Sequence, residues 1–341
     1  MNVGKKIKDF RLVKGVTQET LAQKLGVTAQ AVSRWETGVA MPDIGLLPAL
    51  SIYFGVRIDD FFELSDEAQQ ERIYNMTETE EFIPRADFDH AERFLKDKLA
   101  MNPQDAESLA TLAALYNHRA EGYHRRAESL CKRALDVAPT MKSGHSLLSY
   151  AANGACFDWC SSNHRELIDY YYGFVDKNPD YRSGYMWLLD NLIVDLRLEE
   201  ALEIIQTIDQ IKHDYYPMLM EGYVRSLLGD HDAAETLFAK AMEAEQKNIY
   251  AWSLLGDIRV KQRHYDEAVV CYWKSAELDS NPDFTDNYLS IAYIREMQGK
   301  WAQAADAYEK ALDIYRTNSH LEEGYGVELF RQAILRCRAK A

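Results

Sequence analysis

Prolines recur along this chain at intervals that fit a repeated structural unit. Pro103, Pro139, Pro179 and Pro282 each follow one amphipathic helical pattern and precede another. The intervals between them are 36, 40 and 103 residues, and the last is close to three units of 34. Periods of this size indicate supersecondary units that stack into a solenoid. Units that start three residues after each proline, with two proline-free units in the long gap, begin at 106, 142, 182, 215, 249 and 285.

The residue pattern within these units resembles the tetratricopeptide repeat. In the unit at 249, Trp252 and Tyr272 occupy the fourth and twenty-fourth positions, and Gly256 and Ala268 the eighth and twentieth. Small residues at the eighth and twentieth positions let two helices touch, while large ones fill the space between them. The resemblance implies an all-α solenoid of about six repeats over residues 103–318.

The segments on either side of the repeats are predicted to close the stack, which would otherwise expose apolar faces. Residues 85–102 are expected to form a leading helix, and residues 319–341 a solitary C-terminal capping helix. Residues 65–84 are polar and acidic, so we interpret them as a linker between two domains.

A different pattern occupies residues 17–36, TQETLAQKLGVTAQAVSRWE. Thr17 and Thr28 are each placed to cap a short helix. Gly26 stands between the helices, where a left-handed backbone conformation ends the first one. Two short helices joined by such a turn form a helix-turn-helix, a motif whose second helix enters the major groove of DNA.

Residues 7–62 resemble the phage repressor/Cro type of DNA-binding domain, the XRE family. The resemblance implies a five-helix domain, which we place at residues 1–64, followed by the tetratricopeptide-type solenoid. Its landmarks are Ile7, Phe10, Thr17-Gln18, Gly26-Val27-Thr28, Val32-Ser33-Arg34-Trp35-Glu36, Pro42-Asp43-Ile44 and Tyr53-Phe54-Gly55-Val56.

The second helix of the motif carries the residues expected to read base edges. Gln can pair with adenine, Arg with guanine, and Ala can contact the thymine methyl group. Residues at helix N-termini are expected to contact phosphate. The predicted DNA-binding residues are Gln18, Thr28, Ala29, Gln30, Ser33 and Arg34.

The net charge of −15 fits DNA binding only after it is divided along the chain. Residues 1–34 hold seven Lys and Arg against two Asp and Glu, a net +5. Residues 1–64 hold eight against seven, a net +1, so the remainder carries −16. A basic patch attached to an acidic body favours DNA contact through one end only.

The inner surface of the solenoid is the second candidate site, because solenoids present concave surfaces for binding. The second, fifth, ninth and twelfth positions of each first helix lie on one stripe turned away from the packing between helices. Amides there can pair with a peptide backbone, and aromatic rings can contact its side chains. The predicted partner groove contains Asn117, Tyr150, Asn153, Asp190, Tyr223, Asp257 and Tyr293.

The remaining motifs give weaker indications of a functional site. Cys156, Cys160 and His164 form a C-x3-C-x3-H run that could align on one helical face and hold a metal. Neighbouring turn residues interrupt that helix, so we favour buried cysteines with an unrelated histidine and predict no metal and no cofactor. The chain lacks the nucleophile, phosphate-loop and zinc-protease motifs of common enzymes, so no catalytic residue is predicted.

The two resemblances imply a bacterial-type, sequence-specific transcriptional regulator. It would bind double-stranded DNA, act as a homodimer, and use its repeats to bind a peptide or protein that modulates DNA binding or dimerisation. Irregular cysteine spacing, the lack of an apolar leader and the lack of a long apolar stretch predict a cytoplasmic protein without membrane contact. A protein-interaction scaffold and a Cys/His metal or redox sensor remain the alternatives.

Overall fold

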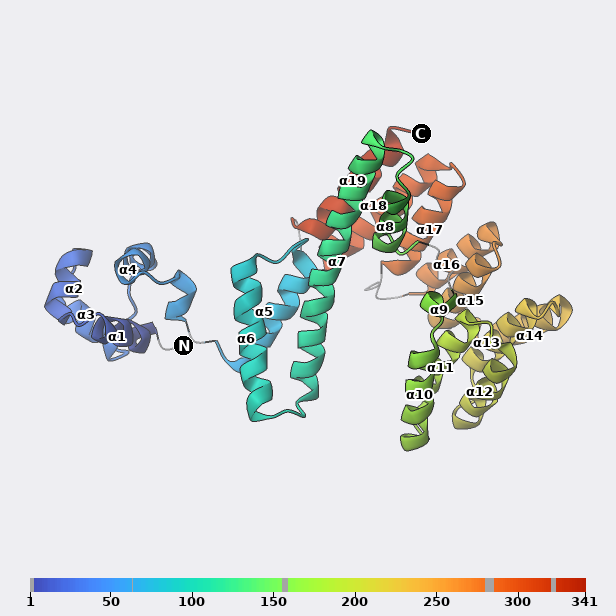
Figure 1. Ribbon diagram of the computed structural model, residues 1–341, viewed down its shortest axis with the longest axis horizontal. Coiled ribbons are helices and arrows are strands. Elements are labelled where there is room, and N and C mark those ends of the chain that lie inside the picture. Colours follow the sequence, from blue (N-terminus) through green and yellow to red (C-terminus); the bar gives the residue numbers. More distant parts are fainter. Residues whose placement is uncertain (1–2, 63, 155–158, 280–284, 320–322) are drawn as a thin grey trace. The chain divides into compact units, whose positions relative to one another are not determined.

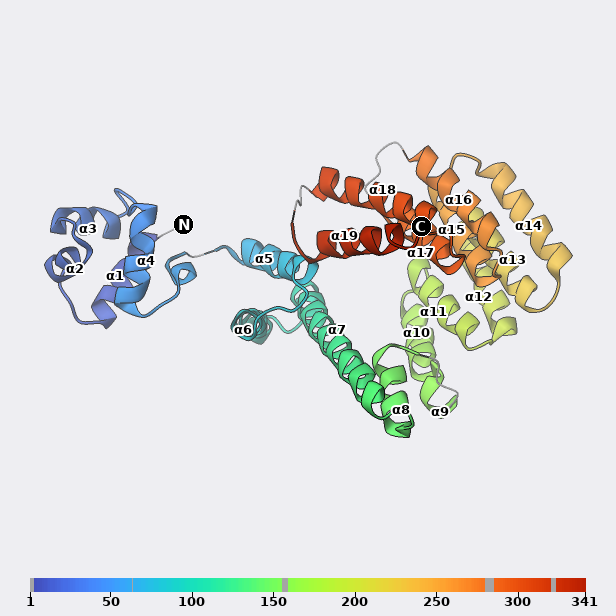
Figure 2. The ribbon, with the colours of Figure 1, turned by 90° about the horizontal axis from the view of Figure 1, so that it is seen from above.

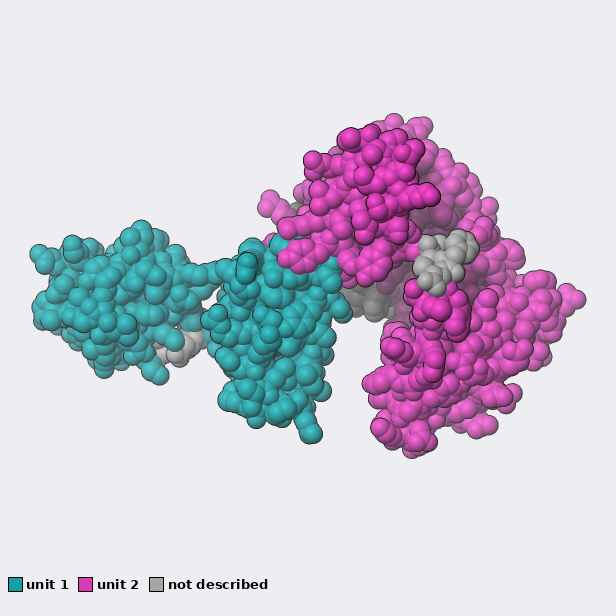
Figure 3. All heavy atoms as spheres, in the orientation of Figure 1, with its two compact units in different colours: residues 1–78, 82–120 teal, residues 79–81, 121–341 magenta. Residues whose placement is uncertain are grey.

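The computed structural model describes residues 3–62, 64–154, 159–279, 285–319 and 323–341, and over these ranges the chain is helical and contains no strand. It divides into two compact units, which Figure 3 shows in different colours. The first comprises residues 1–78 and 82–120, and the second residues 79–81 and 121–341. None of the helices in these ranges has both the length and the apolar character required to cross a membrane.

The N-terminal domain has the predicted order of helices, with its fifth helical element reduced to a 3-10 turn, η2. The Asp60 side chain accepts a hydrogen bond from the backbone N–H of Arg57 at 2.7 Å, which caps the start of this turn, and the chain is extended again at Phe62. Its elements are α1 (Val3–Val13), α2 (Gln18–Leu25), α3 (Ala29–Glu36), η1 (Ile44–Leu46), α4 (Leu47–Phe54) and η2 (Ile58–Phe61).

Local chemistry confirms the helix-turn-helix. The side chains of Thr17 and Thr28 accept hydrogen bonds from Thr20 N and Ala31 N, at 3.2 and 3.1 Å, and so cap α2 and α3. Gly26 ends α2 with φ of 68°. The core of the domain contains the fully buried side chains of Ile7, Leu21, Val32, Leu50 and Phe61.

The segment interpreted as a linker proves to be largely helical. Residues Asp66–Thr79 form α5, followed by α6 (Arg85–Met101) and α7 (Ala106–Val137). Ile73 of α5 is buried in a small core with Ile83 and with side chains of α6 and α7. Most residues of α5 are polar or acidic and lie on its outer face. The few apolar residues that hold the helix in place are too scattered to give a helical pattern in the sequence.

The first predicted repeat differs from the expected helix pair. Helix α7 continues for 32 residues, through the position where a turn was expected. Near that position the sequence offers only Gly122, and a glycine within a helix costs about 1 kcal/mol. That cost is too small to end a helix that has no proline or cap. The repeat at 142 starts as predicted with α8 (Lys142–Ala151) and continues through α9 (Trp159–Ser162) to α10 (Arg165–Lys177).

The regular solenoid consists of four successive helix pairs, the first of which begins with α11 (Figures 1 and 2). Their first helices start at 182, 215, 249 and 286, within one residue of the predicted starts. The pairs are α11 (Arg182–Val194) with α12 (Leu198–Ile211), α13 (Tyr215–Leu227) with α14 (His231–Ala244), α15 (Ile249–Lys261) with α16 (Tyr265–Leu278), and α17 (Asp286–Met297) with α18 (Trp301–Ser319). Helix α19 (Tyr325–Arg338) packs on α18 as the last helix.

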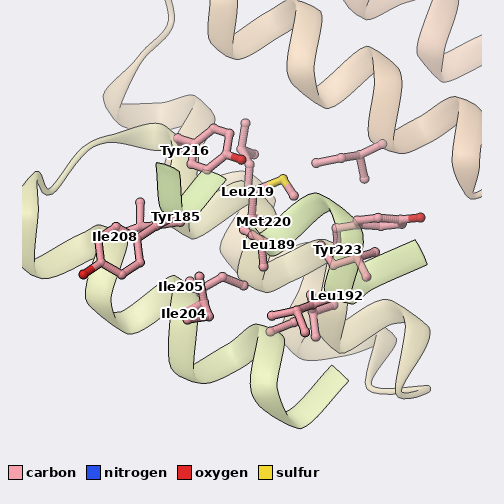
Figure 4. Packing of buried hydrophobic residues seen from close by; sticks show 14 of the residues in the cluster. Tyr185, Leu189, Leu192, Ile204, Ile205, Ile208, Tyr216, Leu219, Met220 and Tyr223 are labelled. Atoms are coloured by element: carbon pink, nitrogen blue, oxygen red, sulfur yellow. The ribbon is translucent and has the colours of Figure 1, made fainter. Parts of the chain in front are cut away.

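Helices of a pair make close contact at the predicted small positions. A Cβ added to Gly222 would lie 2.6 Å from Phe238 Cε1, and one added to Gly256 would lie 2.7 Å from Tyr272 Cε1. The aromatic ring of the second helix therefore rests directly on the backbone of the first. Apolar side chains of α11, α12 and α13 fill the space between the pairs, as Figure 4 shows for Leu189, Ile205 and Leu219.

Turns within the pairs use a left-handed residue at the same repeat position. Gly229 and Gly299 occupy it in two pairs with φ of 87° and 70°, but Leu196 and Arg263 occupy it in the other two with φ of 57° and 63°. Side chains with a Cβ are strained in this conformation by about 1–2 kcal/mol. The turns at these two residues therefore store strain.

Replacing Leu196 or Arg263 with glycine is expected to stabilise the solenoid by about 0.5–1 kcal/mol, because relief of strain exceeds the added entropy of the unfolded chain. Thermal unfolding of the full chain, followed by circular dichroism, measures this. Gly229→Ala is the matched opposite change and should lower the melting temperature. A lower melting temperature in both glycine variants would contradict the strain argument.

Candidate functional sites

Helix α3 presents most of the predicted DNA-binding residues on its outer face. Thr28, Gln30 and Arg34 are exposed, and Ser33 is half-buried. Ala29 is also half-buried and packs partly against the domain core, so it offers less surface than expected. Within the described ranges, the Arg34 guanidinium makes no hydrogen bond or ion pair. The exposed polar face is therefore available to a ligand.

A buried ion pair holds α3 against the first two helices. Arg11 of α1 donates to both carboxylate oxygens of Glu36, at 2.5 and 2.9 Å, and to the carbonyl of Val16 at 2.8 Å. Gln18, the first residue of α2, donates its amide nitrogen to Glu36 Oε2 at 2.8 Å. The two side chains of the ion pair are only 10% and 3% exposed. Glu36, at the end of α3, thus joins three helices.

The electrostatics of Glu36 follow from this geometry. Burial opposes its ionisation, but the hydrogen bonds from Arg11 and Gln18 outweigh burial, and the pKa of Glu36 lies below its usual value. The same carboxylate raises the pKa of Arg11. Gln18 is half-buried and oriented by this contact, and its role at phosphate stays a prediction.

Glu36→Ala is expected to destabilise α3 by about 3 kcal/mol, because it leaves the buried Arg11 without its partner. Hydrogen exchange of the α3 amides in the full chain measures this local stability. Since the pKa of Glu36 is lowered in the folded state, its contribution is complete above the unfolded-state pKa and is lost as pH falls through the folded-state pKa.

The difference between wild type and Glu36→Ala should therefore shrink in acid. Asp9→Ala is the control, since Asp9 is an exposed carboxylate on α1. Equal exchange rates in wild type and Glu36→Ala at neutral pH would show that the ion pair does not hold the helix.

The second candidate site is a cavity of about 550 Å³ formed by the first helices of three successive pairs, α11, α13 and α15. Three predicted groove residues lie in it: Asp190, Tyr223 and Asp257, each at the ninth position of its repeat. Figure 4 shows Tyr223 together with Tyr216 and Met220 on α13. The complete lining is Ser183, Met186, Trp187, Asp190, Ile193, Val194, Tyr216, Met220, Tyr223, Leu254, Asp257, Ile258 and Lys261.

The other predicted groove residues do not line this cavity. Asn117 is exposed in the middle of α7, and Tyr150 of α8 is 75% exposed with its ring against His124. Asn153 follows α8 in a left-handed conformation, with φ of 51°. Tyr293 of α17 is exposed and packs edge-on against a tyrosine of α18. The cavity therefore brings together the predicted groove residues of the third, fourth and fifth repeats only.

Sequence reasoning missed part of the cavity wall. Trp187, Met220 and Leu254 all occupy the sixth position of their repeats, and Lys261 occupies the thirteenth. The predicted stripe used positions two, five, nine and twelve. Positions six and thirteen lie beside that stripe on the helix, so adding them would have found these residues.

The cavity contains two carboxylates and one ammonium group. Asp190 and Asp257 are accessible to water, yet the concave wall limits their hydration, and this burial raises the pKa of both. The positive charge of Lys261 opposes this rise in pKa at each carboxylate. Tyr272 donates a hydrogen bond to Asp257 Oδ1 at 2.6 Å, and the Lys261 ammonium lies 5.6 Å from the centre of the Tyr223 ring.

Of the cysteine–histidine run, the structure describes Cys160 and His164, and the exposed Cys160 shows that the expectation of a buried cysteine is wrong at this position. Cys156 lies outside the described residues. His164 Nδ1 is 2.6 Å from Asp195 Oδ1, and the His164 backbone also donates to that carboxylate. In the part of the chain that the structure describes, no three His, Cys, Asp or Glu side chains are grouped to hold a metal ion.

Comparison with known families agrees with these two architectures. A family model described as helix-turn-helix matches residues 7–61, and models described as tetratricopeptide repeats match residues 249–282 and 288–322. The chain thus combines a helix-turn-helix domain with tetratricopeptide repeats.

Similarity over nearly the full length of a known regulator identifies the family of the N-terminal domain. An HTH-type transcriptional regulator of Methanocaldococcus jannaschii is 39% identical over 62 residues, which cover 18% of this chain and 94% of that protein. This chain belongs to the XRE-type helix-turn-helix transcriptional regulators and carries C-terminal tetratricopeptide repeats.

Other relatives match one part of the chain each. The HTH-type transcriptional activator BcrR of Enterococcus faecalis is 34% identical over 84 residues, covering 22% of this chain and 41% of BcrR. Subunit 3 of the anaphase-promoting complex of Schizosaccharomyces pombe is 20% identical over 211 residues, covering 62% of this chain and 30% of that protein. The chain therefore spans less than half the length of these two relatives.

Solved structures with similar helical arrangements include a tetratricopeptide repeat protein from Parabacteroides merdae and yeast Tom70. The first has a TM-score of 0.40 at 15% identity and covers 80% of this chain and 98% of its own. The second has a TM-score of 0.39 at 14% identity and covers 94% of this chain and 79% of its own.

Proposed function

We propose that this protein is a sequence-specific, DNA-binding transcriptional regulator whose solenoid binds a peptide or protein partner and thereby modulates DNA binding. Helix α3 enters the major groove, with Gln30 and Arg34 reading base edges and Ser33 and Ala29 beside them. Thr28 and Gln18, at the N-termini of α3 and α2, contact phosphate.

The observation that carries the DNA-binding proposal is the exposed face of α3. Arg34 is exposed and has no hydrogen-bond or ion-pair partner among the described residues, so its guanidinium can form two hydrogen bonds to a guanine without breaking a contact. Glu36 on the same helix is held by α1 and α2, which orients this face before DNA arrives. A pre-oriented surface loses less entropy on binding.

The solenoid supplies the regulatory part of the proposal. Its cavity combines apolar walls with a few polar groups, as ligand sites do. We propose that the protein binds DNA as a homodimer, in which the two copies of the small DNA-binding domain read two half-sites. A partner that favours one solenoid conformation would change the spacing of those domains and hence the affinity for DNA. We place this activity in the cytoplasm.

The DNA-binding proposal is tested by selecting bound sites from random duplexes with the full chain, and then measuring affinity for the enriched site. Arg34→Ala is expected to weaken that affinity by about 10- to 100-fold, because one pair of base contacts is worth about 1–3 kcal/mol. Gln30→Ala should relax the preference at a different base pair.

Arg85→Ala is the matched control, since Arg85 is an exposed arginine of α6, 88% accessible at its side chain, and lies outside the helix-turn-helix. It should leave both affinity and preference unchanged. Affinity should also fall with added salt, as phosphate contact requires. If no site is enriched, or if Gln30→Ala and Arg34→Ala keep the wild-type preference, the proposed readout is wrong.

A further inference from the structure

The cavity between α11, α13 and α15 has a charge pattern that selects among possible ligands. Its two carboxylates, Asp190 and Asp257, come from equivalent positions of repeats that are separated by one further repeat. Lys261 is the cation of the lining and interacts with both. The lining is thus left with one excess negative charge.

Asp190 in particular makes no direct polar contact, although the charge of Lys261 acts on it. Within the ranges that the structure describes, its carboxylate forms no hydrogen bond and no ion pair, and its pKa is raised because the cavity wall limits its hydration. A carboxylate in such a setting gains from a second cation that brings hydrogen-bond donors. Asp257 differs, because it already accepts the Tyr272 hydroxyl.

We propose that this cavity binds a lysine or arginine side chain of a partner peptide, with its charged end at Asp190 and Asp257 and an adjoining apolar residue of the peptide on Trp187 and Met220. This inference rests on the peptide-binding part of the proposed function and names the chemistry of the peptide.

The walls of the cavity favour a long basic side chain over a bare cation. Trp187, Met186, Met220 and Leu254 are apolar and lie in the lining together with the two carboxylates. Lysine and arginine bury a hydrocarbon stem on apolar surface while the charged end stays with polar groups. A metal ion would need further ligands, and none of the described side chains completes such a group.

The charges also exclude an acidic peptide as the preferred ligand. An incoming carboxylate would meet two others, and the one ammonium group, Lys261, already interacts with both. The chain after residue 64 carries −16, which adds a long-range attraction for a basic partner.

The test uses the full chain and three pools of short, fluorescein-labelled peptides. Each pool has mixed Leu, Met, Phe and Trp around one fixed central residue, which is lysine, norleucine or glutamate. Fluorescence anisotropy should give the tightest binding for the lysine pool, with an affinity that falls as salt is added.

Asp190→Asn and Asp257→Asn should each weaken lysine-pool binding about tenfold, and leave norleucine-pool binding nearly unchanged. Asparagine keeps an acceptor for Tyr272, so the second variant preserves that packing. Lys261→Met removes the competing cation and should strengthen lysine-pool binding several-fold. Glu243→Gln, an exposed change on α14, is the matched control and should have no effect.

Folding of the variants is checked independently by thermal unfolding. Asp190→Asn should melt at the same temperature as wild type or higher, because it removes an ionised group that the wall disfavours. The inference is overturned if the norleucine pool binds as tightly as the lysine pool, or if both asparagine variants keep wild-type affinity for lysine. In those cases peptide binding itself would still stand. If no pool binds, the peptide-binding part of the proposed function fails as well.

Discussion

Close contact between paired helices is the constraint on which the solenoid and its cavity depend. The rings of Phe238 and Tyr272 lie against Gly222 and Gly256, where any side chain would collide with them. These contacts bring the helices of the α13–α14 and α15–α16 pairs close together. The ninth positions of α11, α13 and α15 line one cavity. Asp190, Tyr223 and Asp257 meet there although 33 and 34 residues separate each from the next.

In the DNA-binding domain, a buried ion pair fixes the positions of neighbouring helices. Glu36 accepts hydrogen bonds from Arg11 and Gln18, and so fixes the last residue of α3 to the two helices before it. A buried ion pair adds little net stability, since desolvation offsets the attraction. We propose that this pair favours one orientation of α3, in which Gln30 and Arg34 are exposed.

The sequence predicted the regular parts of this fold well, because periodic packing leaves a periodic signal. The starts of α11, α13, α15 and α17 agree within one residue, and the caps at Thr17 and Thr28 form as expected. Repeat spacing predicts a turn within α7, but Gly122 alone does not end the helix, which continues to Val137. Helix α5 was missed because its few buried residues, such as Ile73, are scattered in an acidic segment.

The candidate site was predicted only in part, for a physical reason. Spacing along one helix identifies the residues on a stripe, and this placed Asp190, Tyr223 and Asp257 correctly on one face. It does not tell which neighbouring helices approach closely enough to enclose a cavity. Tyr150 occupies the same ninth position of its repeat and Asn153 the twelfth, but α8 ends at Ala151 and contributes no residue to the cavity lining. The place of Lys261 in the cavity lining depends on the packing of α15 beside α13, which the sequence pattern does not give.

We propose that occupation of the solenoid cavity alters DNA binding. The most direct measurement is the affinity of the full chain for its selected site, with and without a saturating amount of the best lysine-centred peptide. We expect bound peptide to change the DNA affinity of wild type at least about fivefold, the usual lower bound for coupled sites. The double variant Asp190→Asn, Asp257→Asn should show no change at the same peptide concentration. Equal DNA affinity of the wild-type chain with and without bound peptide would contradict the account.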